Sequence, residues 1–80
     1  MATIQDKTRA LIAQKLSLSE SEITPDKNFT GDLGADSLDI VEISMLMERE
    51  FNIKFAENDT EKIHTVADVY QLIEQYTSNK

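Results

Sequence analysis

Residues 33–42 read LGADSLDIVE, and this stretch predicts where the main helix of the chain begins. Asp36 is a residue type that favours the N-cap position, and Asp39 has the capping-box spacing from it. Both carboxylates also suit the positive end of a helix dipole. Ser37 then falls in the first turn, beside free backbone N–H groups that would favour an attached phosphate.

The apolar residues that follow predict a helix to about Phe51 with two stripes rather than one. One stripe consists of Ile40, Ile43, Met47 and Phe51; the other consists of Leu38, Val41 and Met45, interleaved with Asp39, Glu42 and Glu48. A single helix of a small bundle cannot bury both faces. We therefore expect the second stripe to be exposed and to bind a protein. The alternative is that both stripes belong to the core, with the carboxylates at its edge.

Upstream of this helix the chain predicts another helix and a long loop. Residues 3–16 have helical apolar spacing, and Thr3 and Asp6 have capping-box spacing. Residues 17–35 hold the one proline and both glycines. Because loops of this length are unusual in compact domains and are often functional, we expect the loop to be fixed to the core by Ile23, Phe29 and Leu33.

Downstream, residues 51–55 alternate like a strand but have no partner strand, so we predict an extended connector. One short helical turn is predicted over residues 58–62. Thr65 with Asp68 caps a last helix, and residues 77–80 are expected to fray. The inner face of this last helix is predicted to consist of Val66, Val69, Tyr70, Ile73 and Tyr76.

The predicted fold class is all-α, a four-helix bundle of three main helices and one short helix with a long first loop. Eighty residues form one small domain, 1–80, and we expect a monomer. Such a bundle could enclose a narrow apolar space between its helices.

The acidic charge of the chain is concentrated in its second half. The net charge is −7, and residues 36–61 hold eight acidic residues against Arg49 and Lys54. Such a surface repels nucleic acid and anionic membranes and attracts basic protein surfaces. No stretch is long and apolar enough to span a membrane, and the first residues lack signal-peptide features. We therefore expect a cytoplasmic protein.

Two kinds of site are disfavoured by the residues present. A serine hydrolase needs a base against the hydroxyl, but the one histidine, His64, is expected at the surface, and Ser37 is not in a G-x-S-x-G elbow. Residues 26–32 partly match a calcium loop, yet the twelfth position is Ser37 where a glutamate belongs. The chain is therefore expected to be neither an enzyme nor a metal-site protein. A small acidic interaction or calcium-binding module without a prosthetic group stays open.

The motif around Ser37 resembles the acyl carrier protein family. Gly34-Ala35-Asp36-Ser37-Leu38-Asp39 carries the family's D-S-L signature with its usual flanks. The resemblance extends through Val41-Glu42, Met45, Glu48-x-Glu50-Phe51 and Glu61-Lys62-Ile63-x-Thr65-Val66, and it covers essentially the whole chain.

This resemblance implies that Ser37 carries covalent 4′-phosphopantetheine, transferred from coenzyme A by a phosphopantetheinyl transferase that binds the Mg²⁺. The absent cysteine fits, since the working thiol would arrive on the prosthetic group. The resemblance also implies that acyl-processing enzymes with basic docking patches bind Asp36, Leu38, Asp39, Val41, Glu42, Met45 and Glu48. It further implies an acyl pocket lined by Phe29, Ile43, Met47, Ile63 and Val69.

Several residues depart from the family's pattern. Thr8 stands where an aliphatic residue is usual, and Leu46 and Val69 are bulkier than the common residues. Arg49 interrupts the acidic run, and Ala56 replaces a common proline. We expect an acyl carrier of type II fatty acid synthesis. The alternatives are carriers of the same fold that serve polyketide, aminoacyl or specialised lipid synthesis.

Overall fold

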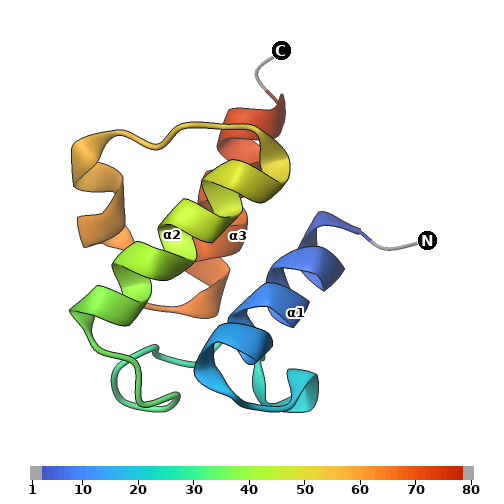
Figure 1. The fold of residues 1–80 in the computed structure, drawn as a ribbon, viewed down its shortest axis with the longest axis vertical. Coiled ribbons are helices and arrows are strands. Elements are labelled where there is room, and N and C mark those ends of the chain that lie inside the picture. Colours follow the sequence, from blue (N-terminus) through green and yellow to red (C-terminus); the bar gives the residue numbers. More distant parts are fainter. Residues whose placement is uncertain (1–2, 79–80) are drawn as a thin grey trace.

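The structure, a computed structural model, describes residues 3–78, and its regular secondary structure is helical (Figure 1). Three main helices, α1 (Ile4–Leu16), α2 (Ser37–Phe51) and α3 (Val66–Ser78), are accompanied by two short 3₁₀ helices, η1 (Glu20–Glu22) and η2 (Glu57–Lys62). Within residues 3–78 the one β-type contact is an isolated bridge between Asn28 and Thr65. No helix of this range is long and apolar enough to cross a bilayer. The predicted all-α class is confirmed.

Side-chain caps fix the starts of all three main helices. Thr3 accepts a hydrogen bond from Asp6 N at 3.0 Å, and the Asp6 carboxylate accepts one from Thr3 N at 3.2 Å. Thr65 and Asp68 form the corresponding pair before α3, at 3.3 and 2.9 Å. Because each box satisfies N–H groups that have no helical partner, the helix starts follow closely from the sequence.

The core is formed by the facing sides of the three main helices and by the loops that close their ends. The predicted inner face of α3 is confirmed for Val66, Val69, Tyr70 and Ile73, which are buried, whereas Tyr76 is half-buried. Thr8 is fully buried, and its hydroxyl is satisfied because it donates to Ile4 O at 2.7 Å.

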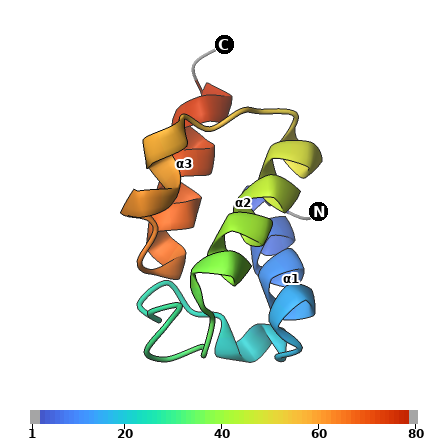
Figure 2. The same ribbon diagram turned by 60° about the vertical axis from the view of Figure 1, so that its left-hand side comes forward.

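The loop between α1 and α2 closes one end of the bundle (Figure 2). Of its predicted anchors, Ile23 and Phe29 are buried and Leu33 is half-buried. Phe29 N donates to His64 O at 3.0 Å, and Val66 N donates to Lys27 O at 3.1 Å. These bonds hold the loop against the start of α3 and so fix the residues that lead into α2.

Two predictions about local structure were wrong. Residues 17–35 are not wholly irregular, because η1 forms where the Glu22 carboxylate accepts from Ser19 N at 3.0 Å. Residues 77 and 78, which were predicted to fray, are helical, since α3 extends to Ser78 and the Thr77 hydroxyl donates to Ile73 O at 2.7 Å. Residues 79 and 80 lie outside the described part of the chain.

Candidate functional site

The approach to Ser37 is a tight turn fixed from both sides. Gly34 has φ +71°, a left-handed conformation that L side chains rarely adopt. No atom lies within 4 Å of the position of an added Cβ, so glycine is needed for its conformation rather than for space. Ala35 is buried, and its N–H donates to Phe29 O at 2.8 Å. The start of α2 is therefore held by the loop core.

The predicted capping box at the start of α2 is confirmed. Asp39 N donates to Asp36 Oδ1 at 2.9 Å, and Asp36 N donates to Asp39 Oδ2 at 3.2 Å. Ser37 and Leu38 occupy the first two positions of the helix, where the N–H groups have no helical partner. Two backbone donors therefore remain beside the Ser37 side chain, where they would favour a phosphate.

Ser37 is exposed, next to a shallow depression between α2 and η2. The depression has a volume of about 170 Å³ and is lined by Ser37, Ile40, Val41, Thr60 and Glu61. Figure 1 shows η2 beside the N-terminal half of α2. A group attached to Ser37 would thus have both solvent and a partly apolar surface within reach.

The Ser37 hydroxyl has no base held against it among the described residues. Within residues 3–78, no hydrogen bond joins the Ser37 hydroxyl to another residue. His64 is exposed, and its backbone N–H donates a hydrogen bond to the Asp68 carboxylate at 2.9 Å. Within the described residues, no side chain is therefore placed to activate the Ser37 hydroxyl as a nucleophile.

Comparison with known proteins agrees with this geometry. The family model of the phosphopantetheine attachment site matches residues 6–73. The chain belongs to the acyl carrier protein family. A solved structure from Mycobacterium tuberculosis that is assigned to the acyl carrier proteins is 32% identical over 86% of this chain and 92% of that chain, with a TM-score of 0.80. The prosthetic group of this carrier is covalent 4′-phosphopantetheine. The protein is a carrier of acyl groups rather than an enzyme, and it interacts with transferases and acyl-processing enzymes.

The exposed stripe of α2 lies as its spacing predicts. Leu38, Val41 and Met45 of this carrier are 65%, 42% and 56% exposed, and they are its largest exposed apolar side chains among the described residues. The other stripe contains buried Ile43 and Met47, so the alternative that both stripes are core is wrong.

The acidic residues of that stripe are not all free to bind a partner. Glu42 forms an ion pair with Lys15 of α1, and this carboxylate raises the pKa of the lysine. Glu48 is half-buried and accepts a hydrogen bond from Phe55 N at 2.7 Å. Asp36 and Asp39 are used in the capping box but keep outward-facing surface. The resemblance implies one docking role for all four carboxylates, whereas their contacts in the structure differ.

The residues predicted to line an acyl pocket come together in the core of the carrier. They come from the first loop, from α2, from the segment after η2 and from α3, and each is at most 3% exposed: Phe29, Ile43, Met47, Ile63 and Val69. The side chains therefore pack as core in this structure. An acyl chain could enter among them only if they moved apart.

One functional-looking acid of the sequence is in fact structural. Asp59, counted among the surface acids, is only 5% exposed. Its carboxylate accepts from the Tyr76 hydroxyl and from Ala56 N, the latter at 2.8 Å, and lies 3.8 Å from Lys62 Nζ. Tyr76 comes from α3, so this carboxylate ties η2 to α3. The three-residue spacing from Ala56 was a signal, but the tyrosine was not predictable from it.

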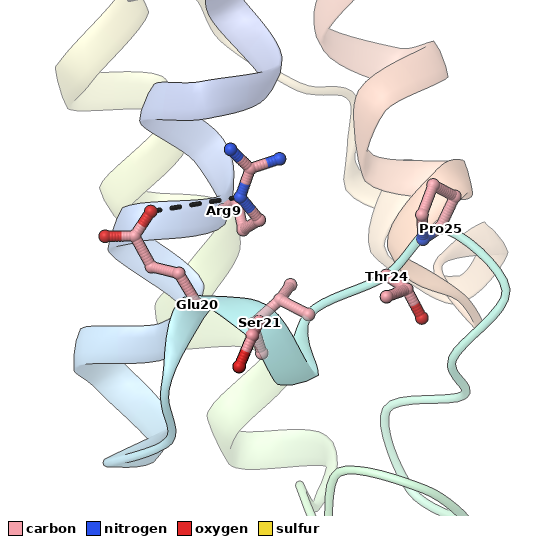
Figure 3. Close-up of a pocket in the computed structure, with 6 residues that line it drawn as sticks. Arg9, Glu20, Ser21, Thr24 and Pro25 are labelled. Atoms are coloured by element: carbon pink, nitrogen blue, oxygen red, sulfur yellow. Dashed lines mark ion pairs between the residues drawn. The ribbon is translucent and has the colours of Figure 1, made fainter.

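Two other polar regions of the carrier are internally satisfied. In the calcium-like stretch, Asp26 accepts from the Thr24 hydroxyl at 2.7 Å and Asp32 accepts from Asn28 N at 2.8 Å; no group of three ligating side chains suited to a metal occurs within residues 3–78. A depression of about 420 Å³ lies between α1 and the loop (Figure 3). There the Arg9 guanidinium forms ion pairs with Asp6 Oδ1 at 2.7 Å and with Glu20 Oε1 at 3.8 Å.

Proposed function

We propose that Ser37 is the attachment residue of 4′-phosphopantetheine and that the carrier serves type II fatty acid synthesis. The observation that carries the proposal is an exposed, unpaired hydroxyl in the first turn of α2, inside the segment that the family model matches. When attached, the group supplies the thiol on which acyl chains are carried as thioesters. The test is the intact mass before and after incubation with coenzyme A, Mg²⁺ and a broad-specificity phosphopantetheinyl transferase.

The residues around Ser37 have separate tasks in this proposal. The N–H groups of Ser37 and Leu38 would stabilise the phosphate. Gly34 and buried Ala35 hold the turn so that the hydroxyl stays at the surface. The transferase supplies the base and the metal, which is why the carrier needs neither.

We further propose that the exposed stripe of α2, with Asp36, Asp39 and the carboxylates beside it, is the docking face for basic patches on partner enzymes. Three exposed apolar side chains beside acids suit brief binding, since charge speeds encounter and the small apolar area permits release. Two copies would bring like charges together, which favours a monomer. We propose that the carrier is located in the cytoplasm, where it would move between separate enzymes.

Neutralising Asp39 tests the docking face. Asp39→Asn keeps an oxygen that can accept from Asp36 N, so the helix cap is preserved. We expect transfer of the prosthetic group to slow about threefold at low salt and much less at high salt, because steering is screened. Glu74→Gln, on exposed α3 surface, removes the same charge and should leave the rate nearly unchanged. Equal rates for both variants would mean that the acids of α2 only solubilise the protein.

We also propose that acyl chains enter the core between α2 and α3, among the five buried residues named above. Octanoylation of the attached thiol should then raise Tm by ~5 °C or more, because the chain leaves water only when the carrier is folded. Thermal melts of the protein with the free thiol and with the octanoyl thioester provide the comparison. An unchanged Tm would indicate that the chain remains in solvent.

The fatty acid assignment rests on the acidity of the docking face and on Asp39 after the D-S-L signature. Polyketide and aminoacyl carriers of the same fold differ in the enzymes that load them. The genes that lie beside this one, a ketosynthase set or a dedicated ligase, would separate these pathways. Acceptance of a malonyl group from malonyl-coenzyme A, catalysed by a fatty acid malonyltransferase, is the expected biochemical result.

A further inference from the structure

An ion pair and a groove meet where α1 and α2 pack together. Lys15 of α1 binds Glu42 of α2, with 30% and 42% of their side chains exposed. The groove, of about 300 Å³, is lined by Leu11, Gln14, Lys15 and Leu46. Lys15 therefore belongs to both features, since its ammonium group neutralises Glu42 while its side chain borders the groove.

We propose that Lys15 is a replaceable latch: a basic helix of a partner enzyme displaces it from Glu42 and places an apolar side chain in the groove between Leu11 and Leu46. This inference rests on the proposed carrier function and extends its docking face from α2 onto α1. The occupant is thus a helix that presents a cation and an apolar residue on the same side.

The spacing of the groove residues defines that helix. Leu11 lies four residues before Lys15 on α1, and Leu46 lies four residues after Glu42 on α2. Residues four apart share a helix face about one turn from each other. The ion pair and the apolar floor are therefore roughly 5–6 Å apart along the groove. An arginine and a leucine three or four positions apart on a partner helix would match this distance.

The latch can open at low cost. Ion pairs on protein surfaces contribute little to stability, because both charges are well solvated when separated. A lysine stem also covers apolar surface while its ammonium stays in water. When Lys15 leaves, Glu42 gains the cation of the partner, and the partner's apolar side chain covers the surface that the stem gave up.

Charge complementarity favours a basic occupant over other ones. With Lys15 displaced, Glu42 and Asp39 present two carboxylates one turn apart on α2, three residues from each other. An acidic partner or a second copy of this carrier would place like charge against them. Until it is displaced, however, Lys15 competes with any incoming cation for Glu42.

The test is a double-mutant cycle on the rate of prosthetic-group transfer. The proteins are wild type, Lys15→Gln, Glu42→Gln and the double variant, with a broad-specificity phosphopantetheinyl transferase as the partner. We expect Lys15→Gln to raise kcat/KM about threefold at low salt, as the size of an exposed ion pair implies. The gain should disappear in the Glu42→Gln background, because nothing remains to compete for. Lys7→Gln, at an exposed site of α1, changes the net charge equally.

The outcomes separate this inference from the proposed function. No mass gain in wild type would overturn the carrier proposal at Ser37. Normal transfer to wild type with Lys15→Gln no faster than Lys7→Gln would overturn the latch alone. A gain that persists without Glu42, or a rate that falls when Lys15 is removed, would also overturn it, because competition for Glu42 would then be absent.

The groove has its own variant. Leu46→Ala removes apolar surface from its floor, so we expect kcat/KM to fall about threefold at both low and high salt, since apolar contact is not screened. Circular dichroism at the assay temperature verifies that the variant is folded. Unchanged transfer to folded Leu46→Ala would show that no apolar side chain binds there.

Discussion

Ser37→Ala is expected to abolish prosthetic-group transfer completely while leaving the carrier folded. The hydroxyl oxygen is the atom to which the phosphate would be joined, so its removal leaves no acceptor. Intact mass after incubation with coenzyme A and the transferase should show one added phosphopantetheine in wild type and none in the variant. A mass gain in Ser37→Ala would place the attachment at another residue.

The fold of this variant is predictable from the position of Ser37. It is the first residue of α2, whereas the cap belongs to Asp36 and Asp39. An exposed serine at this position can become alanine with a change in unfolding free energy within about 0.5 kcal/mol. Ser44→Ala provides a matched control on the same helix, since Ser44 is buried and its hydroxyl donates to Ile40 O at 3.0 Å. That variant should be loaded like wild type, although it is expected to be less stable.

The features that sequence predicted well are local ones. Each main helix starts at a polar pair three residues apart, and these pairs satisfy the first N–H groups regardless of the rest of the fold. The exposed stripe of α2 was predictable for a related reason, because its helical spacing is visible within one element. The position of the Ser37 hydroxyl follows from both.

The features that were missed join residues far apart in the chain. Lys15 and Glu42 meet only because α1 packs on α2, and Asp59 meets Tyr76 only because η2 packs on α3. Nothing in the spacing of these residues specifies such a contact. Charge patterning therefore assigned Glu42 and Asp59 to one acidic surface, although one is paired and the other is buried. The acyl-pocket residues stay a prediction, since lining residues and core residues have the same sequence pattern and these five side chains pack as core.

Asp59→Asn is expected to destabilise the carrier by about 1.5–3 kcal/mol, the range for hydrogen bonds to a charged group. The substitution keeps the shape of the side chain but removes the charge that holds the Tyr76 hydroxyl and Ala56 N–H. For a domain of this size the loss corresponds to a Tm lower by roughly 10–20 °C. Glu57→Gln, an exposed acid of the same short helix, should change Tm by no more than a few degrees. Denaturant unfolding of Asp59→Asn and Glu57→Gln measures these changes. Unfolding of Tyr76→Phe and of the Asp59→Asn/Tyr76→Phe double variant then measures the coupling energy between Asp59 and Tyr76.

The dependence of this effect on pH has a definite sign. The Tyr76 hydroxyl holds the pKa of Asp59 below its usual value, against a smaller opposing effect of burial. A lowered pKa in the folded state means that the stabilisation is present above about pH 4, the unfolded value, and is lost as pH falls through the folded value. The pKa values of Asp26 and Asp68 are lowered too, so wild type and Asp59→Asn both lose stability in acid. The difference in stability between these two proteins should shrink only where Asp59 protonates. An Asp59→Asn loss of stability that stays constant down to pH 3 would contradict a hydrogen bond to a charged carboxylate.

Because η2 also borders the depression beside Ser37, a variant with a loosened η2 should retain less of the Tm gain on octanoylation.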